Sequence, residues 1–304
     1  INYFMSKLFP LEELRNYMWD HLASTLIGVN YSQTVNIYTG SGSNGKSLLV
    51  DLMGKMLGDY KGTVPNQLIT QKRTNIGTAT PEIAQLFGVR YAVISEPSKG
   101  DSINEGILKE ITGGDPLQGR LLYGNTITFV PQFKLAVCTN TLPDIKAQDQ
   151  GTWRRIRLCP YMSKFIDNPV SDDPDEPYQF LKDDDLAQEK IPVWVQTFMT
   201  MLIKRALVSK GKVKDCKIVL EASDNYRNDQ DCLNEFIKVK IKTDDPKGTV
   251  QKNTLSTVFK QWYNQEYGNR SIPKSKELYE RFEKQFGKYS RCWKGISIIY
   301  DDEE

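Results

Sequence analysis

A glycine-rich loop constrains this chain more than any other feature of its sequence. The loop matches the pattern G-x-x-x-x-G-K-[ST] at every fixed position. In this pattern the glycines let backbone N–H groups surround phosphate oxygens, the lysine reaches the β- and γ-phosphates, and the last hydroxyl binds Mg²⁺. The sequence therefore predicts a nucleoside triphosphate site whose residues are Gly40, Ser41, Gly42, Ser43, Asn44, Gly45, Lys46 and Ser47.

The segments on either side of the loop favour this interpretation over a Gly/Ser surface turn. Residues 34–38 alternate and are rich in β-branched side chains, which predicts a strand. Apolar residues then recur at helical spacing from Leu48 to Met56, which predicts a helix that starts near Lys46 and ends at Gly58. The N-terminus of that helix would add a favourable dipole to the phosphate site.

Length and composition set the broad class of the protein. A chain of 304 residues with 39% hydrophobic and 26% charged residues is typical of a globular protein with two domains. We expect no membrane span, because no apolar stretch approaches the required length, and no leader peptide. The chain begins with Ile1 and lacks an initiator Met, so we expect a fragment of a longer protein.

Cysteine and histidine usage argues against a zinc site. The five cysteines are scattered and never spaced as C-x-x-C, and His21 is the single histidine. This usage is typical of a reducing intracellular compartment, in which each cysteine is a small buried hydrophobe. His21 lies on or beside an apolar helix face, so we interpret it as structural.

The net charge of +2 conceals two regions of opposite sign. Residues 171–189 contain eight acidic residues and one lysine, whereas residues 237–294 contain 14 Lys or Arg residues and six Asp or Glu residues. A basic, aromatic-rich segment near the end of the chain indicates a module that binds a polyanion. A solvated charged face is the alternative.

Strand-like and helix-like segments alternate between residues 31 and 161, after a predicted helix at 11–27. Strands are expected at 91–94 and 135–138, with a helix at 104–111 between them. Such alternation predicts a mostly parallel sheet covered by helices, an α/β fold. Residues 120–129 interrupt it as a hairpin or bulged turn.

Further helices and strands are expected in the second half of the chain. The acidic, proline-punctuated segment 171–185 is either a linker or an insertion loop. A long helix is predicted at 192–208. Helices at 254–267 and 276–286, followed by two short strands around Lys294, suggest a winged-helix module.

Hydrolysis of a bound triphosphate needs groups beyond the phosphate loop. Glu96 ends an apolar strand and is the candidate to polarise the attacking water, whereas Ser95 stands where a second acid is often found. Asn140 ends the next apolar strand and is the candidate γ-phosphate sensor. Arg154 and Arg155 are candidates for an arginine that stabilises transition-state charge from a neighbouring subunit.

Four segments together resemble the superfamily 3 helicases, and more narrowly the phage P4-type and poxvirus-type primase-helicases of large nucleo-cytoplasmic DNA viruses. These segments are GSGSNGKS, VISEP, KEITGGDPLQGRLLYGNTITFVPQFKLAVCTNTLP and GTWRRIRL. The resemblance is strong over residues 1–165 and loose afterwards.

The resemblance implies an AAA+ P-loop NTPase core that forms a hexameric ring around DNA. It assigns catalysis to Lys46, Glu96, Asn140 and Arg155, with Arg154 as the alternative finger, and Mg²⁺ binding to Ser47 and Glu96. It also makes Lys109, Arg120 and Tyr123 candidate DNA contacts. The expected division is an N-terminal helical segment (1–30), an ATPase core (31–165), an acidic linker with a helical segment (166–228) and a basic winged-helix-like module (229–304).

The function expected from these observations is ATP-dependent DNA unwinding in viral, phage or plasmid-like replication. Its cofactors would be ATP and Mg²⁺, its partners DNA, further copies of the chain and a primase domain in the full-length protein. An ATP-switched DNA clamp or loader is the alternative, and a P-loop kinase explains fewer of the motifs. The expected location is intracellular, in the host cytoplasm if the source is a virus.

Overall fold

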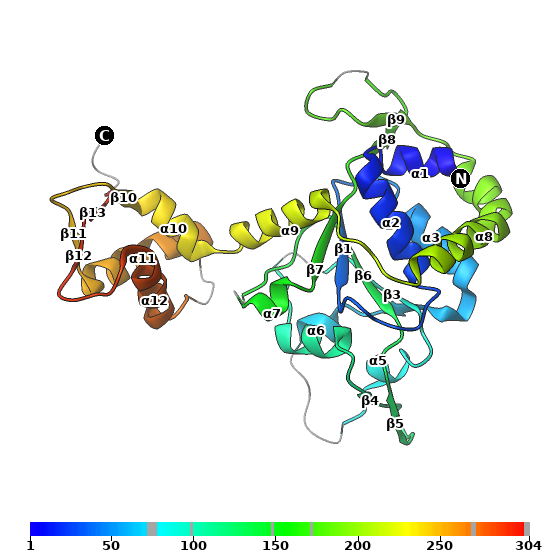
Figure 1. Cartoon of the computed structure of the whole chain (residues 1–304), viewed down its shortest axis with the longest axis horizontal. Coiled ribbons are helices and arrows are strands. Elements are labelled where there is room, and N and C mark those ends of the chain that lie inside the picture. Colours follow the sequence, from blue (N-terminus) through cyan, green and yellow to red (C-terminus); the bar gives the residue numbers. More distant parts are fainter. Residues whose placement is uncertain (72–77, 98–99, 147–148, 171–172, 269–271, 301–304) are drawn as a thin grey trace. The chain divides into compact units, whose positions relative to one another are not determined.

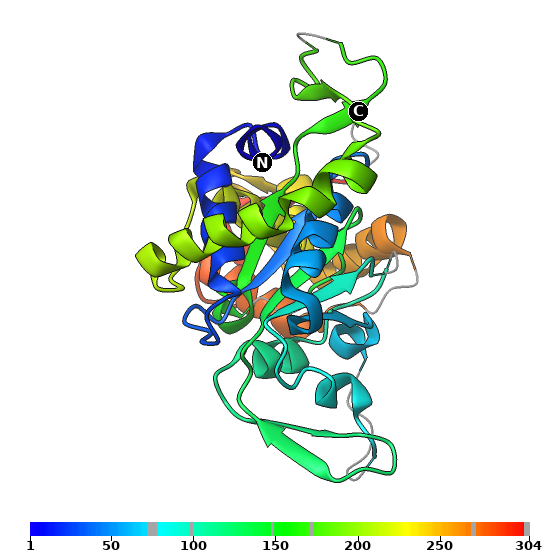
Figure 2. The ribbon, with the colours of Figure 1, turned by 90° about the vertical axis from the view of Figure 1, so that its right-hand side faces the viewer.

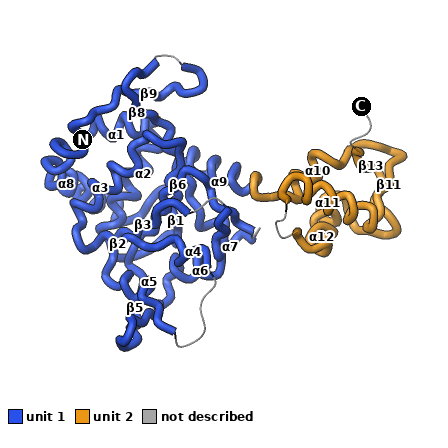
Figure 3. Tube along the Cα trace, turned by 180° about the vertical axis from the view of Figure 1, so that it is seen from behind, with its two compact units in different colours: residues 1–227 blue, residues 228–304 orange. Residues whose placement is uncertain are grey.

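The computed structural model describes residues 1–71, 78–97, 100–146, 149–170, 173–268 and 272–300. It divides into two compact units, residues 1–227 and residues 228–304 (Figure 3). Each unit has its own hydrophobic core.

The first unit is built on a five-stranded sheet in which every pairing is parallel (Figure 1). Its strands, in spatial order, are β2 (Lys61–Val64), β3 (Tyr91–Ser95), β6 (Lys134–Thr139), β1 (Val35–Thr39) and β7 (Ile156–Pro160). The four strands β3, β6, β1 and β7 are largely buried, as expected for a parallel sheet with both faces covered. The α/β class and the parallel sheet predicted from the alternating sequence are therefore confirmed.

Alternating strand residues face two separate core layers. Tyr38 and Tyr91 pack with helices α2 (Glu12–Ser24), α3 (Lys46–Leu57) and α8 (Ile191–Ser209) on one face of the sheet (Figures 1 and 2). The neighbouring strand residues belong to the other layer, together with helix α6 (Glu105–Thr112) and the short helices α4 (Gln67–Thr70), α5 (Pro81–Ala84) and α7 (Gln150–Trp153). Apolar burial on both faces fixes the sheet between two helical layers.

The first unit also contains smaller elements outside the sheet and its two helical layers. They are α1 (Asn2–Leu8), the 3₁₀ turn η1 (Gly58–Tyr60), the antiparallel hairpin β4 (Leu117–Arg120) and β5 (Thr126–Phe129), the parallel pair β8 (Lys164–Ile166) and β9 (Gln179–Leu181), the π-helical turn η2 (Leu186–Lys190) and α9 (Lys217–Asp229). The acidic segment of the sequence lies between β8 and α8, within the first unit; its first two residues, 171 and 172, lie outside the described residues.

Our expectation that no apolar stretch reaches the length of a membrane span was wrong. Among the described residues, the helical stretch Leu186–Ser209 is long and apolar enough to cross a membrane by length and composition. The sequence of this stretch is apolar on more than one face, and one of those faces, which carries Phe198, Leu202 and Ala206, packs into the core beside α2 and α3. A core helix passes the same length and composition test.

The second unit contains α10 (Cys232–Lys240), β10 (Ile241–Thr243), β11 (Thr249–Val250), α11 (Lys252–Tyr267), α12 (Ser275–Phe286), β12 (Trp293–Lys294) and β13 (Ile296–Ile298). The last strand, β13, pairs antiparallel with β10, so the first and last strands of the unit lie side by side. The large aromatic side chains of this region, Trp262, Phe282 and Trp293 among them, are buried in its core. The aromatic content of the basic segment therefore serves packing.

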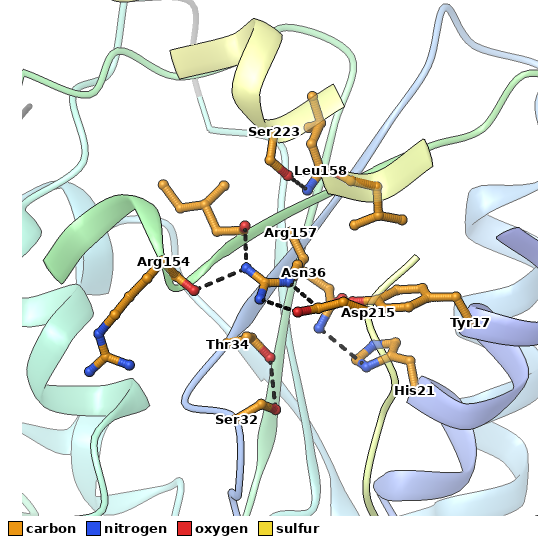
Figure 4. A network of polar contacts seen from close by, with 12 residues as sticks. Tyr17, His21, Ser32, Thr34, Asn36, Arg154, Arg157, Leu158, Asp215 and Ser223 are labelled. Carbon is orange, nitrogen blue, oxygen red and sulfur yellow. Dashed lines mark hydrogen bonds and ion pairs between the residues drawn. The ribbon is translucent and has the colours of Figure 1, made fainter. Parts of the chain in front are cut away.

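A buried polar network joins α2 to the sheet below the glycine-rich loop (Figure 4). Tyr17 Oη donates to Asn36 Oδ1 at 2.6 Å, Asn36 Nδ2 donates to His21 Nδ1 at 3.2 Å, and His21 Nε2 lies 2.8 Å from Tyr38 Oη. Because Nδ1 accepts a hydrogen bond, the imidazole is neutral and its proton resides on Nε2. His21 is structural, as its place on the helix face predicted.

The burial of His21 makes the stability of the first unit depend on pH. Burial, assisted by the nearby charge of Lys134, lowers the pKa of His21 to about 3. In the unfolded chain the same imidazole takes up a proton below about pH 6.5. Stability is therefore full above pH 6.5 and is lost as the pH falls toward 3. We expect the free energy of unfolding to drop by about 2 kcal/mol between pH 7 and pH 5 from this residue alone.

Urea unfolding at both pH values, followed by circular dichroism, measures this drop. His21→Gln removes the titrating group and keeps a polar side chain, so its pH dependence in this window should be shallower. The pKa of Asp149 is lowered to about 2 by its hydrogen bond with Lys109. Protonation of Asp149 therefore changes the free energy of unfolding below pH 5, outside the range between pH 5 and pH 7. Equal pH slopes for the wild type and His21→Gln would contradict the assignment.

Candidate functional site

The topology of the sheet brings the glycine-rich loop, Glu96 and Asn140 to one edge. The glycine-rich loop follows β1, Glu96 follows β3 and Asn140 follows β6. These three strands are consecutive neighbours and parallel, so their carboxyl ends meet at the same edge. Three segments that lie far apart in the sequence thus form one site.

The conformation of the loop explains its glycines. Gly42 and Gly45 have φ angles of 98° and 78°, in the left-handed region that glycine adopts at little cost. A β-carbon at Gly45 would also lie 2.6 Å from Cδ1 of Leu8, so a larger residue would displace α1. Helix α3 begins directly afterwards at Lys46, which presents the free N–H groups of its first turn to the loop.

Lys46, Asn140 and Glu96 are joined by hydrogen bonds. Lys46 Nζ donates to Asn140 Oδ1 at 2.8 Å and to the carbonyl of Gly40 at 3.2 Å. Asn140 Nδ2 in turn donates to Glu96 Oε1 at 3.0 Å. An ammonium can only donate and a carboxylate can only accept, which fixes the orientation of the amide between them. The amide thus links Lys46, the candidate phosphate-binding lysine, to the candidate base.

The charge of Lys46 is held in a largely buried position. Burial lowers the pKa of this lysine, and the Glu96 carboxylate opposes the shift. A triphosphate would offer the ammonium stronger anionic partners than a carbonyl and an amide oxygen. The site is therefore suited to exchange the Asn140 contact for phosphate oxygens.

The backbone of Glu96 is strained. Its φ of 37° lies in a region that non-glycine residues seldom adopt, and its N–H donates to the carbonyl of Cys138 at 2.7 Å. This turn carries the carboxylate off β3 toward Asn140. Ser95 remains within the strand and does not line the cavity described below.

A cavity of about 670 Å³ opens at this edge of the sheet. Residues 42–47 line it together with Glu96 and Asn140, so the predicted phosphate, water and sensor groups share one space. The Ser47 hydroxyl and the Glu96 carboxylate supply the oxygen donors that Mg²⁺ prefers. This donor set fits the metal that a bound triphosphate requires.

The arginines lie at the opposite edge of the sheet. Val35 N, at the start of β1, donates to the carbonyl of Arg155 at 2.8 Å, and β7 begins at the next residue. Since β1 and β7 run parallel, a full strand of five residues, about 17 Å, separates Arg154 and Arg155 from the phosphate loop. Neither arginine lines the cavity. They cannot reach a nucleotide bound by their own subunit.

The three arginines of this segment have different environments. Arg154 is exposed and donates to Gln33 Oε1 at 2.8 Å. Arg155 is half-buried, bonds the carbonyl of Gly151, and its buried Nε has no hydrogen-bond partner among the described residues. Arg157 forms a two-point ion pair with Asp215 at 2.7 and 3.0 Å. Arg157 thus has a structural role, and Arg154 and Arg155 remain the candidates for the finger.

The candidate DNA contacts are dispersed. Tyr123, with 97% of its surface exposed and a φ of 58°, forms the tip of the β4–β5 hairpin, and Arg120 ends the first strand of that hairpin. Lys109 instead lies on α6, where its ammonium bonds both carboxylate oxygens of Asp149 at 2.9 and 3.0 Å. Asp149 also caps α7 through Thr152. Lys109 therefore links α6 to the arginine-bearing segment.

Sequence reasoning missed half of the cavity wall. Tyr3 and Lys7 of α1, Phe165 of β8, and Leu181 with the residues that follow it line the cavity beyond the phosphate loop. None of these residues belongs to a motif, and none is close in sequence to the loop. The one available signal was the presence of aromatic residues in the segments that flank the predicted core.

The chain is similar to several known proteins. A protein family of unknown function (DUF5906) matches residues 38–155, which include the glycine-rich loop, Glu96, Asn140 and both arginines. The C-terminal region of NrS-1 has a solved structure that is similar to 78% of this chain and 52% of its own length, with a TM-score of 0.54 and 16% identity. That likeness concerns the fold.

Homologues occur among viral proteins. A protein of Acanthamoeba polyphaga mimivirus named "Putative helicase" is 35% identical over 285 residues, which cover 91% of this chain and 30% of that protein. A "Putative helicase" of frog virus 3 is 31% identical over 99% of this chain and 32% of its own length. A "Putative primase" of African swine fever virus is 26% identical over 86% of this chain and 28% of its own length. The chain spans about a third of the length of these relatives. It is a homologue, over nearly its whole length, of viral proteins named as helicases and primases.

Proposed function

We propose that this chain is the motor part of a viral replicative DNA helicase, an AAA+ ATPase that separates DNA strands as it hydrolyses ATP. The observation that carries the proposal is the division of the catalytic groups between two edges of one sheet. The phosphate loop, Glu96 and Asn140 share a cavity, whereas Arg155 lies a strand length away. Such a division requires a second subunit to complete the site.

Each group has a distinct part in hydrolysis. Lys46 and the backbone N–H groups of the loop hold the phosphates, and Asn140 orients the attacking water against the γ-phosphate. Glu96 accepts the proton of that water as its oxygen bonds to phosphorus and the bond to ADP breaks. Ser47 and Glu96 would hold Mg²⁺, which offsets phosphate charge when bound.

The position of the arginines supports a ring of subunits. In a ring built from head-to-tail contacts, the side of the sheet where the strands begin faces the carboxyl ends of the strands in the next subunit. Arg155 then reaches the nucleotide bound by that neighbouring subunit. The resemblance to superfamily 3 helicases makes this ring a hexamer. ATP hydrolysis would then occur at each subunit interface.

Two surfaces support DNA binding. The β4–β5 hairpin exposes Leu121, Leu122 and Tyr123 at its tip, where a DNA base can stack. In the second unit two short strands follow two helices, which supports the expected winged-helix module. Exposed cations lie at the end of its last helix and after it, at Lys284, Lys288, Arg291 and Lys294. These cations would bind phosphates, so DNA affinity should fall steeply with salt.

Strand separation tests the proposal directly. Purified protein with Mg-ATP and forked DNA should release the displaced strand, and Glu96→Gln should bind ATP and DNA without releasing it. An intact, oligomeric protein that hydrolyses ATP slowly, independently of DNA, and leaves the fork paired would favour the ATP-switched clamp or loader. Ser95, in the place of a second acid, is the feature that fits this alternative.

Tyr123→Ala is expected to weaken single-stranded DNA binding by about 10-fold, because stacking on an aromatic ring contributes on the order of 1–3 kcal/mol per base. ATP hydrolysis without DNA should not change, since the hairpin tip is remote from the cavity residues. Fluorescence anisotropy with labelled oligonucleotide measures the affinity. Phe87→Ala removes another exposed aromatic, which packs on Phe129 at the base of the hairpin, and serves as the comparison. Equal loss in both variants would assign the effect to hairpin structure.

The same proposal covers the wider protein. A primase domain elsewhere in the full-length polypeptide fits the primase names among the homologues. The proposed site of action is the replication site of an infected cell, in the host cytoplasm. Within the chain, we keep the division into an N-terminal helical segment, an ATPase core, an acidic segment and a winged-helix module as a proposal.

A further inference from the structure

We propose that α1 and the β8–β9 segment form the nucleobase subsite of this ATPase, and that the subsite selects purines by size and does not distinguish adenine from guanine. This inference rests on the proposed function, because it assigns the half of the cavity that the phosphate loop leaves open.

The cavity is larger than the phosphate site needs. The phosphate-binding residues, Glu96 and Asn140 occupy one end of it. The remaining wall comes from α1, β8, β9 and the start of α8, and its side chains are mainly aromatic or aliphatic. Figures 1 and 2 show α1, the β8–β9 pair and the start of α8 on the same side of the sheet. An apolar, partly aromatic wall beside a phosphate site has the chemistry to bind a nucleobase.

The apolar wall is fixed to the phosphate loop. Phe165 N donates to the carbonyl of Ser43 at 2.7 Å, so β8 is hydrogen-bonded to the loop itself. The position of a β-carbon on Gly45 would lie 3.4 Å from the Phe165 ring. Ser163 Oγ donates to the carbonyl of Lys7 at 2.6 Å and thereby joins β8 to α1. A ligand held by the loop must therefore have Phe165 and α1 as neighbours.

Two aromatic rings in this wall are held in place. Lys7 Nζ lies 4.5 Å from the centre of the Tyr3 ring and 5.5 Å from the centre of Phe180. Phe180 packs against Phe165, with ring centres 5.8 Å apart. Tyr3 nevertheless exposes 72% of its surface, so its ring has free area for a ligand. Prearranged rings lose little entropy when a base stacks on them.

Four charged side chains at the rim form two ion pairs. Lys190 Nζ pairs with Asp183 and Lys182 Nζ with Asp184, each at 2.5 Å. A lone carboxylate would favour guanine, whose N1–H and amino group both donate, and a lone ammonium would favour the carbonyl of guanine. Each of these acids has a lysine partner, and Lys7 lies over the Tyr3 and Phe180 rings. None of these five charges is therefore left alone to select one base edge. Contact area then decides, and a purine offers more area than a pyrimidine.

Competition binding measures the expected selectivity. ATP and GTP should displace a fluorescent ATP analogue with affinities within about 3-fold of each other, and CTP and UTP about 10-fold more weakly. Tyr3→Ala and Phe165→Ala should each weaken ATP binding by about 10-fold, the order of one lost stacking contact. Inorganic tripolyphosphate, which contacts only the phosphate loop, should bind all variants equally.

Tyr60→Ala is the matched control, because Tyr60 is 56% exposed and lies outside the cavity. Tyr3 is also largely exposed, so its replacement leaves the fold intact. Unchanged ATP affinity in both cavity variants, with tripolyphosphate still bound, would overturn the subsite and leave the proposed function standing. A more than 10-fold preference between ATP and GTP would overturn selection by size. Failure of the wild type to bind either ATP or tripolyphosphate would instead refute the proposed function.

Discussion

Lys46→Ala should reduce the rate of ATP hydrolysis by at least about 100-fold. The substitution removes the one ammonium among the described cavity-lining residues that lies within hydrogen-bond distance of Asn140, at 2.8 Å. Loss of a single preorganised donor to a developing charge costs on the order of 10²–10³ in rate. The Lys46–Asn140–Glu96 chain would also lose its first member, so the sensor and the base would lose their fixed positions. Phosphate release from saturating ATP measures the effect.

Lys55→Ala provides the control for this experiment. Lys55 belongs to the same helix, but its side chain is exposed and pairs with Asp51 one turn earlier. Its replacement should leave turnover within about 2-fold of the wild type, because surface ion pairs contribute little. If Lys46→Ala retained full turnover, the cavity would not be the site of hydrolysis.

Arg155→Ala should retain ATP binding and lose about 1000-fold in turnover. An arginine that stabilises the transition state from a neighbouring subunit contributes on the order of 10³–10⁵ to the rate. Binding should survive, because Arg155 lies at the edge of the sheet opposite the cavity of its own subunit. Its buried Nε, which has no hydrogen-bond partner in the described part of the chain, distinguishes it from Arg154, which is exposed. Arg154→Ala should therefore have a smaller effect, and the reverse order would make Arg154 the finger.

Mixing two inactive variants tests whether the arginine acts across subunits. Lys46→Ala supplies an intact arginine, and Arg155→Ala supplies an intact phosphate loop. Where the two meet in the correct order, one complete site forms, so the mixture should hydrolyse ATP faster than either variant alone. An arginine that acts within its own subunit would give no recovery at any mixing ratio.

Local sequence predicted many of the longer elements of the fold. Alternating or helical apolar spacing predicted the strand before the loop, the helix after it and helices at 192–208 and 254–267. The two helices are observed at Ile191–Ser209 and Lys252–Tyr267. The α/β class followed as well, because alternating strands and helices form parallel sheets. Spacing was less informative about which face of α8 is buried, because its apolar residues occupy more than one face. The helical stretch Leu186–Ser209 also meets the length and composition criteria of a membrane span.

The sequence by itself determined the chemistry of this protein: a phosphate loop, an acid, an amide and arginines, each at the end of a predicted element. Only the tertiary structure decided which of these groups share a site. Strand order brings β1, β3 and β6 together at their carboxyl ends, and parallel pairing places the arginines before β7 at the other edge. The structure also recruits α1 and β8 to the cavity, through contacts between residues more than 150 positions apart. Local patterns cannot encode such contacts, because they depend on how the apolar faces of distant segments pack together.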